Sequence, residues 1–142
     1  MLAQELDFRE IFKMSQTGMA LLSSDLVFID ANDEFIEHSG RPIEQLVGRN
    51  FYDVFPKMPQ DRSGEPRWFA LEEAMTSGRR EAQHLIRYDV QNPGTGVFDE
   101  RYFSTRVQPI RAANGQVEAY EMSILEVTPV IEAYLALQAH QP

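Results

Sequence analysis

Histidine and cysteine are the side chains best suited to chemistry near neutral pH, and this chain has three of the first and none of the second. The histidines stand far apart in the sequence, at His38, His84 and His140. A zinc site needs several ligands brought to one point, usually from short spacings along the chain. The absence of cysteine excludes disulfides, thiolate nucleophiles and iron–sulfur clusters. The sequence therefore predicts no metal site and no thiol chemistry.

Other catalytic patterns are weak as well. No serine lies in the Gly-x-Ser-x-Gly context of a nucleophile elbow, and Gly94-Thr95-Gly96 is typical of a hairpin turn rather than of a phosphate-binding loop. His84 is the residue to inspect for an enzyme site, although a hydrogen-bonded histidine on a sheet face is its commoner role. We therefore expect the domain itself not to be an enzyme.

Charge and composition limit the partners. Thirteen basic and 22 acidic residues give a net charge of −9, which repels a phosphate backbone, so we expect neither nucleic-acid nor membrane binding. No apolar run approaches the roughly 20 residues of a membrane helix. With the absence of cysteine, this predicts a cytoplasmic protein. A length of 142 residues, 43% of them hydrophobic, suits one domain with a packed core.

The elements that would position these side chains follow from hydrophobic periodicity. Apolar residues at helical spacing predict an amphipathic helix over residues 2–14 and another over Trp68–Ser77. Two apolar runs around Ser23-Ser24-Asp25 predict a β-hairpin. Asn32 is a suitable cap for a short helix that ends near Gly40. Two further helical turns are expected, at residues 42–46 and 50–55.

After residue 80 the period changes from that of a helix to that of a strand. Ala82, His84, Ile86, Tyr88 and Val90 alternate with polar or mixed positions, as in a half-buried strand. Further strands are expected over residues 97–109 and 117–127, and Pro129 suits the first turn of a last helix that Thr128 would cap. The chain therefore belongs to the α+β class with one antiparallel sheet.

Several motifs in this order resemble the PAS family of sensory domains. Asp30-Ala31-Asn32-Asp33-Glu34-Phe35 is similar to its strand-to-helix corner, and the segment from Gly40 to Asn50 is similar to its helical linker. Asn114-Gly115 is similar to its last hairpin turn, and Glu126-Val127-Thr128 stands where the family usually has Asp-Ile-Thr or Asp-Val-Thr. The resemblance implies a five-stranded antiparallel sheet with short helices over one face and flanking helices at both ends.

This sequence departs from the family pattern at two positions. Glu126 replaces the usual aspartate, which puts the usual salt bridge at the junction in doubt, although the longer carboxylate could still reach a partner. Arg41 stands where an aromatic residue is common.

The resemblance also implies a small-molecule or cofactor site between the helices and the sheet. A flavin adduct to cysteine is excluded, and haem is disfavoured because the long helix offers no histidine and His38 is expected on an exposed helix end. His84, Met58 and Met75 are the remaining haem ligands to consider, while a non-covalent flavin or a small metabolite stays open. Plain core packing is an alternative for every candidate, and at most one of Tyr102 and Phe103 can face the pocket. The candidate lining residues are Trp68, Leu71, Met75, His84, Ile86, Tyr88, Tyr102 and Phe103.

The resemblance further implies a division of the chain and a direction of signalling. Residues 1–16 would form a flanking helix, residues 17–128 the sensory domain and residues 129–142 the start of an exit helix. Glu126, Val127 and Thr128 would carry the signal into that helix, and from there to an output domain in this or a partner chain, such as a histidine kinase, a cyclic-di-GMP enzyme or a transcription regulator. A homodimer joined through the apolar terminal helices is expected. The alternative is a dimerisation or protein-docking module that binds no small ligand.

Overall fold

The computed structural model describes residues 6–56, 69–92 and 94–140. Its main sheet has five antiparallel strands in the order β2-β1-β7-β6-β3, and a separate two-stranded ribbon pairs β4 with β5. This confirms the α+β fold and the five-stranded sheet expected from the sequence. The strands are β1 (Gly18–Ser23), β2 (Phe28–Ala31), β3 (Glu81–Arg87), β4 (Val90–Gln91), β5 (Phe98–Asp99), β6 (Tyr102–Arg111) and β7 (Val117–Glu126).

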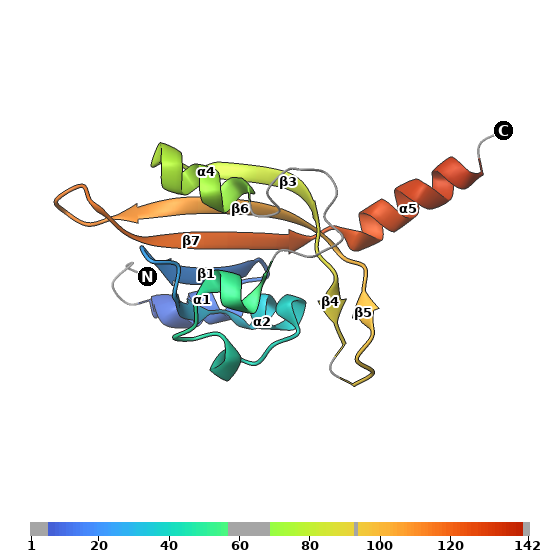
Figure 1. Cartoon of the computed structure of the whole chain (residues 1–142), viewed down its shortest axis with the longest axis horizontal. Coiled ribbons are helices and arrows are strands. Elements are labelled where there is room, and N and C mark those ends of the chain that lie inside the picture. The colour runs from blue at the N-terminus through green and yellow to red at the C-terminus, as the bar shows by residue number, and fades with distance from the viewer. Residues whose placement is uncertain (1–5, 57–68, 93, 141–142) are drawn as a thin grey trace.

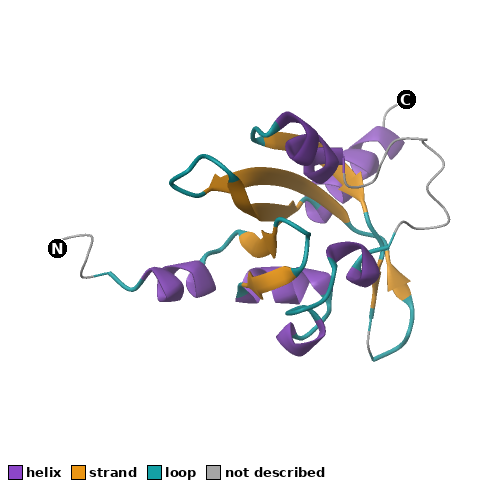
Figure 2. Ribbon diagram, turned by 60° about the vertical axis from the view of Figure 1, so that its left-hand side comes forward, coloured by secondary structure: helices purple, strands orange, loops and turns teal. Residues whose placement is uncertain are grey.

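Short helices lie against the sheet, and a longer helix leaves it (Figure 1). Helix α4 packs on β3 and β6, and helix α2 packs on β1. Helix α5 extends away from the end of the sheet opposite the β6–β7 turn, and the β4–β5 ribbon projects from the same region (Figures 1 and 2). The helices are α1 (Phe8–Met14), α2 (Asp33–Ser39), the 3-10 helix η2 (Ile43–Gln45), α3 (Phe51–Val54), α4 (Phe69–Ser77) and α5 (Thr128–Ala139).

The two long strands follow the predicted alternation. Thr105 pairs with Ile124 and Val107 with Met122, and all four side chains are buried on the inner face of the sheet. Strand β6 continues to Arg111, past the expected end at Pro109. This is possible because β3 pairs with β6 only as far as Val107, so the missing N–H of proline leaves no ladder bond unmade.

The predicted strand from Ala82 to Val90 is interrupted. The pairing of β3 with β6 shifts register between Gln83 and Ile86, a β-bulge that leaves both His84 and Leu85 exposed. Beyond the bulge the chain leaves the sheet after Arg87 and forms the ribbon. The expected inward set from Ala82 to Val90 was therefore wrong at Ala82 and His84, which lie before or in the bulge, because an extra residue in a strand reverses which positions face the core.

Four phenylalanines fill the core beneath the short helices. The rings of Phe28, Phe35, Phe51 and Phe55 lie 5.4 to 6.2 Å apart between centroids, in edge-to-face or tilted arrangements. They come from β2, α2 and α3, so short elements far too small to be stable alone are held by one aromatic cluster.

Asn32 fixes the start of α2, as expected of a helix cap, and also binds the N-terminal segment. Its side-chain oxygen accepts from the N–H groups of Phe35 at 3.0 Å and Met19 at 2.9 Å. Its amide donates to the carbonyls of Phe12 at 3.0 Å and Thr17 at 2.9 Å. The amide is completely buried, so this one side chain satisfies four backbone groups between α1, β1 and α2.

A helix was predicted over residues 2–14. In the described residues α1 covers only Phe8–Met14, with Asp7 as its cap. The domain boundaries given above stay a prediction. Among the residues that the structure describes, no helix has both the length and the apolar character needed to cross a membrane.

Candidate functional site

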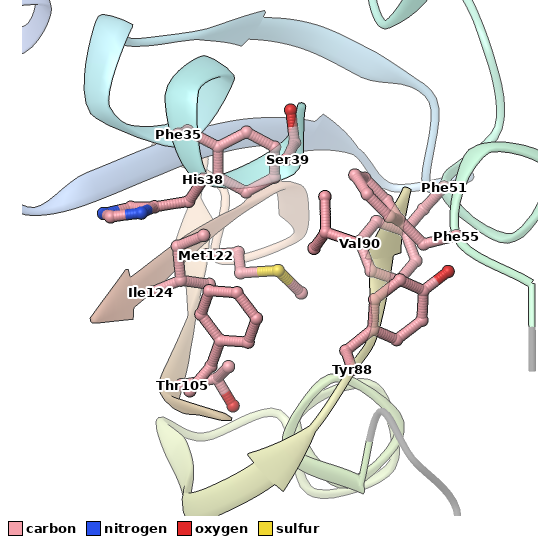
Figure 3. A pocket seen from close by; sticks show the side chains of 11 residues that line it. Phe35, His38, Ser39, Phe51, Phe55, Tyr88, Val90, Thr105, Met122 and Ile124 are labelled. Atoms are coloured by element: carbon pink, nitrogen blue, oxygen red, sulfur yellow. The ribbon is translucent and has the colours of Figure 1, made fainter. Parts of the chain in front are cut away.

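A small apolar cavity lies between the inner face of the sheet and the ends of α2 and α3 (Figure 3). Its volume is about 30 Å³, room for one or two water-sized groups. Most of its wall is aromatic and aliphatic. The lining residues are Phe35, His38, Ser39, Phe51, Phe55, Tyr88, Val90, Phe103, Thr105, Met122 and Ile124.

A larger cleft of about 280 Å³ adjoins the cavity and shares Ser39, Phe55, Tyr88 and Val90 with it. The cleft is bounded by the segment after α2, the end of α3 and the β4–β5 ribbon. Its other lining residues are Gly40, Arg41, Gln45, Pro56, Asp89, Gln91 and Phe98. The two spaces together form a site with an apolar inner end and a polar outer end.

Four of the predicted lining residues are buried on the inner side of the sheet. Tyr88 lines both spaces, and its hydroxyl donates to the carbonyl of Pro56 at 3.3 Å. Leu71 and Ile86 belong to the hydrophobic core but not to the cavity wall. Phe103, the alternative to Tyr102, lines the cavity.

The other predicted lining residues lie away from the cavity. Met75 is 44% exposed because α4 buries Ala70, Leu71 and Ala74 and thereby turns position 75 outward. His84 lies in the β-bulge described above. Tyr102 is half-buried outside the wall, and its hydroxyl donates to Glu100, a hydrogen bond that raises the pKa of Tyr102. Trp68 and Met58 lie outside the described residues.

Sequence reasoning missed His38. It was expected on an exposed helix end, but its side chain is only 20% exposed and lines the cavity. Its Nδ1 lies 3.2 Å from Oε1 of Glu126, and its Nε2 lies 3.3 Å from Oε2 of Glu34. A ring protonated on both nitrogens donates to both carboxylates, whereas a neutral ring donates to one of them. Its position three residues after the core residue Phe35 is the sequence signal that could have placed it on the buried face of α2.

Glu126, at the junction between β7 and α5, contacts two other residues through one carboxylate oxygen. Its Oε1 accepts from Arg101 Nη1 at 3.2 Å as well as facing His38, so the longer carboxylate does reach partners. Arg101 also approaches Asp99, with 3.7 Å between Nη2 and Oδ2. A single carboxylate thus joins helix α2, the segment between β5 and β6, and the last residue of β7.

Two hydrogen bonds tie the next residues of the junction to β6. The N–H of Val127 donates to the carbonyl of Tyr102 at 2.7 Å, and the N–H of Tyr102 donates to Oγ1 of Thr128 at 2.9 Å. Thr128 was expected to cap α5, but its hydroxyl makes this bond to β6 instead, and α5 starts without a side-chain cap. The start of α5 is therefore held by hydrogen bonds to β6 and not by a side-chain cap.

The described side chains do not suit a metal or a large cofactor. No group of three or more His, Asp or Glu residues among them is arranged to hold a metal ion. Sites for drug-sized ligands occupy about 300–1,000 Å³, so a flavin or haem ring does not fit the inner cavity of about 30 Å³ without a large rearrangement, and only the outer cleft of about 280 Å³ approaches that size.

Comparison with known families and structures gives one family and a set of similar folds. A family model described as the PAS fold matches residues 12–132. An RNA-binding Light-Oxygen-Voltage receptor superposes with a TM-score of 0.71 at 21% identity, over 93% of this chain and 35% of its own. A LOV protein of Rhodobacter sphaeroides gives 0.66 at 17% identity, over 84% of this chain and 64% of its own.

A sensory box sensor histidine kinase from Vibrio cholerae gives a TM-score of 0.56 at 19% identity, over 85% of this chain and 89% of its own. At these identities the likeness concerns the fold. This chain spans only about a third of the RNA-binding receptor and somewhat under two thirds of the Rhodobacter protein.

Proposed function

The chain belongs to the PAS-fold family, whose model covers most of its length, and from this premise we propose that it is a sensory module that binds a small ligand and relays the binding through α5. The proposed site is the apolar cavity together with the adjoining cleft. The proposed path runs through Glu126, Val127 and Thr128 into α5, the residues expected from the sequence to carry the signal.

One observation carries this proposal: His38 belongs to the cavity wall and to the junction at the same time. The His38 ring packs against the ring of Phe103, with 6.2 Å between the ring centroids, and its Nδ1 faces Glu126. Phe103 and Glu126 are also directly paired across β6 and β7. A group that enters the cavity must contact or displace residues that hold the junction.

The physical requirement for signalling is a difference in binding between two arrangements of the junction. The contacts of His38 and Arg101 with Glu126 are partly exposed, so each contributes modestly and can be exchanged for other partners. A ligand that holds the end of α2 in a different position would weaken the His38–Glu126 contact and release the start of α5.

The nature of the ligand can be tested by absorbance and mass. Because the cavity is too small for a flavin or haem ring, we expect purified protein to show no absorbance band above about 350 nm, where such chromophores absorb. Native mass spectrometry should reveal a small co-purified molecule. A bound non-covalent flavin would overturn the proposed size of the ligand.

A substitution that fills the cavity tests whether the ligand binds there. Met122 is 1% exposed and lies in the middle of the lining residues (Figure 3). Met122→Phe should fill the cavity and abolish the co-purified mass, whereas Met122→Leu, which keeps the volume, should retain it. Retention of the same mass by Met122→Phe would remove the cavity as the site.

A second function, dimerisation or protein docking, is favoured by apolar side chains on the terminal helices. On α1 Phe8 is 64% and Met14 75% exposed, and on α5 Val130 is 67% and Leu137 68% exposed. Deleting residues 129–142 should weaken self-association in sedimentation experiments if α5 carries the dimer interface. An unchanged dimer would discard that role for α5.

The remaining parts of the proposal concern the whole protein. We propose that the domain has no catalytic activity of its own, works in the cytoplasm and controls an output domain in this or a partner chain. One of the similar structures is an RNA-binding receptor, but the net charge of −9 disfavours contact with a phosphate backbone, so we do not propose RNA as a partner.

A further inference from the structure

The cleft at the outer end of the site contains an arginine with no carboxylate partner among the described residues. Arg41 follows α2, lines the cleft and holds its guanidinium 6.0 Å from the centre of the Phe55 ring. The part of the chain that the structure describes offers it no ion pair. In a chain with an excess of nine acidic residues, a cation left without a carboxylate partner at the mouth of a cavity is available to an anion.

The other charged residue of the cleft does not cancel this positive charge. Asp89 lines the same cleft, but its Oδ1 accepts from Nε of Arg87 at 3.1 Å and its Oδ2 from Nη2 at 3.3 Å. Arg87 also lies 3.5 Å from Glu100, so its charge is shared, but Asp89 still has a cation beside it, whereas Arg41 in the same cleft lining has no carboxylate partner among the described residues.

The Phe55 ring joins the two parts of the site. It lines the inner cavity and the outer cleft, and it is the ring that Arg41 lies over. A ligand that reaches from Arg41 along Phe55 therefore passes directly from a cationic into an apolar environment. The inner end admits only one or two water-sized groups.

We propose that the ligand is a short-chain monocarboxylate, with its carboxylate at Arg41 and its alkyl end in the inner cavity. This inference rests on the proposed sensory function and specifies the ligand class for the same site. The one basic side chain of the inner cavity, His38, already faces the carboxylates of Glu34 and Glu126, so a second carboxylate on the ligand would find no free cation there and dicarboxylates are rejected. A neutral amide of the same shape loses the charge-assisted bonds to the guanidinium.

The test is an amide-resolved NMR titration of the whole chain with butyrate, butanamide and succinate, in which the signals of Gly40, Val90 and Gln91 report on the cleft. Butyrate should shift these signals to saturation, and butanamide and succinate should each bind about tenfold more weakly or worse. Arg41→Gln should weaken butyrate binding by about tenfold or more. Arg49→Gln, which removes an exposed cation outside the cleft, should leave it unchanged.

Three outcomes overturn the inference. Equal binding of butanamide and butyrate, or butyrate binding unaffected by Arg41→Gln, contradicts the carboxylate class while small-molecule sensing stands. Failure of all three compounds to shift the cleft signals also overturns it, and the native mass spectrum of the unmodified chain then decides separately whether the site binds any small molecule.

Discussion

The two ends of helix α2 differ in how they are held. At its start, the fully buried Asn32 makes four hydrogen bonds to backbone groups of α1, β1 and α2 and carries no charge. At its end, the half-buried His38 lies between two carboxylates, one of which belongs to the junction with α5. Only six positions along the chain separate the structural anchor, Asn32, from the candidate relay, His38.

This difference shows what a sensing element requires. A buried amide with every donor and acceptor satisfied has one low-energy arrangement, and any change to it leaves polar groups unpaired. A partly exposed ion pair can exchange its partner for water at small cost. The first end therefore gives α2 a fixed pivot, and the second allows its last turn to respond to the cavity.

The largest expected effect is at the fixed end. Asn32→Ala leaves four backbone groups without their partner, so the free energy of unfolding should fall by about 3 kcal/mol or more, measured by urea denaturation. Asn50 caps α3 by accepting from the N–H of Tyr52 and makes one further, exposed bond to the carbonyl of Asp25, so Asn50→Ala should cost about 1 kcal/mol. Equal losses in the two variants would contradict the role of Asn32 as the anchor.

A smaller effect is expected at the other end of α2. Gly40 ends the helix with a φ of 70°, and a Cβ there would lie 3.0 Å from Cγ1 of Val90 in the cavity wall. Gly40→Ala should cost about 1–2 kcal/mol, from the left-handed backbone and the close contact together. Gly48 has a φ of 84° but nothing within 4 Å of such a Cβ, so Gly48→Ala measures the backbone part alone. If the two variants lose the same stability, α2 and the ribbon do not pack as closely as described.

The smallest effect is expected on the outer face of the sheet, away from both ends of α2. Burial raises the pKa of Glu121, while Ser123 and Arg80 act in the opposite direction. The folded chain thus holds this proton more tightly than the unfolded chain, so the free energy of unfolding falls as the pH rises from about 4.5 through the raised value.

Glu121→Gln should therefore flatten the pH dependence of stability over that range, as followed by thermal unfolding at several pH values. Glu118 is an exposed residue of the same strand, and Glu118→Gln should leave the slope as it is. A steeper slope in Glu121→Gln would show that the sign is wrong.

Local patterns predicted the fixed end of α2 well. An asparagine directly after an apolar strand and before an apolar helical face is a cap by residue type, and Asn32 acts as one. The long alternating strands likewise followed from their spacing, because most of their buried positions are two residues apart.

The responsive end depended on contacts that no local pattern contains. His38 meets Glu126 across 88 positions of sequence, so its burial could not be derived from α2 alone. His84 was placed inward because a β-bulge is invisible in a pattern of alternating residues. Tyr88 was placed in the site by the alternation of residues. It does line the cavity, because it lies beyond the bulge, where the alternation resumes.

The central claim is that His38 couples the cavity to the start of α5, and hydrogen exchange tests it without a ligand. His38→Leu removes the contact to Glu126 and keeps an apolar wall. The amides of Val127 and Ile131, at the start of α5, should then exchange about fivefold faster or more, while those of Phe35 and Ile36 beside Asn32 stay unchanged.

Glu34→Gln, which alters the partner of His38 outside the junction, should have a smaller effect on the same amides. Unchanged exchange at Val127 and Ile131 in His38→Leu, or an equal acceleration at both ends of α2, would contradict the claim.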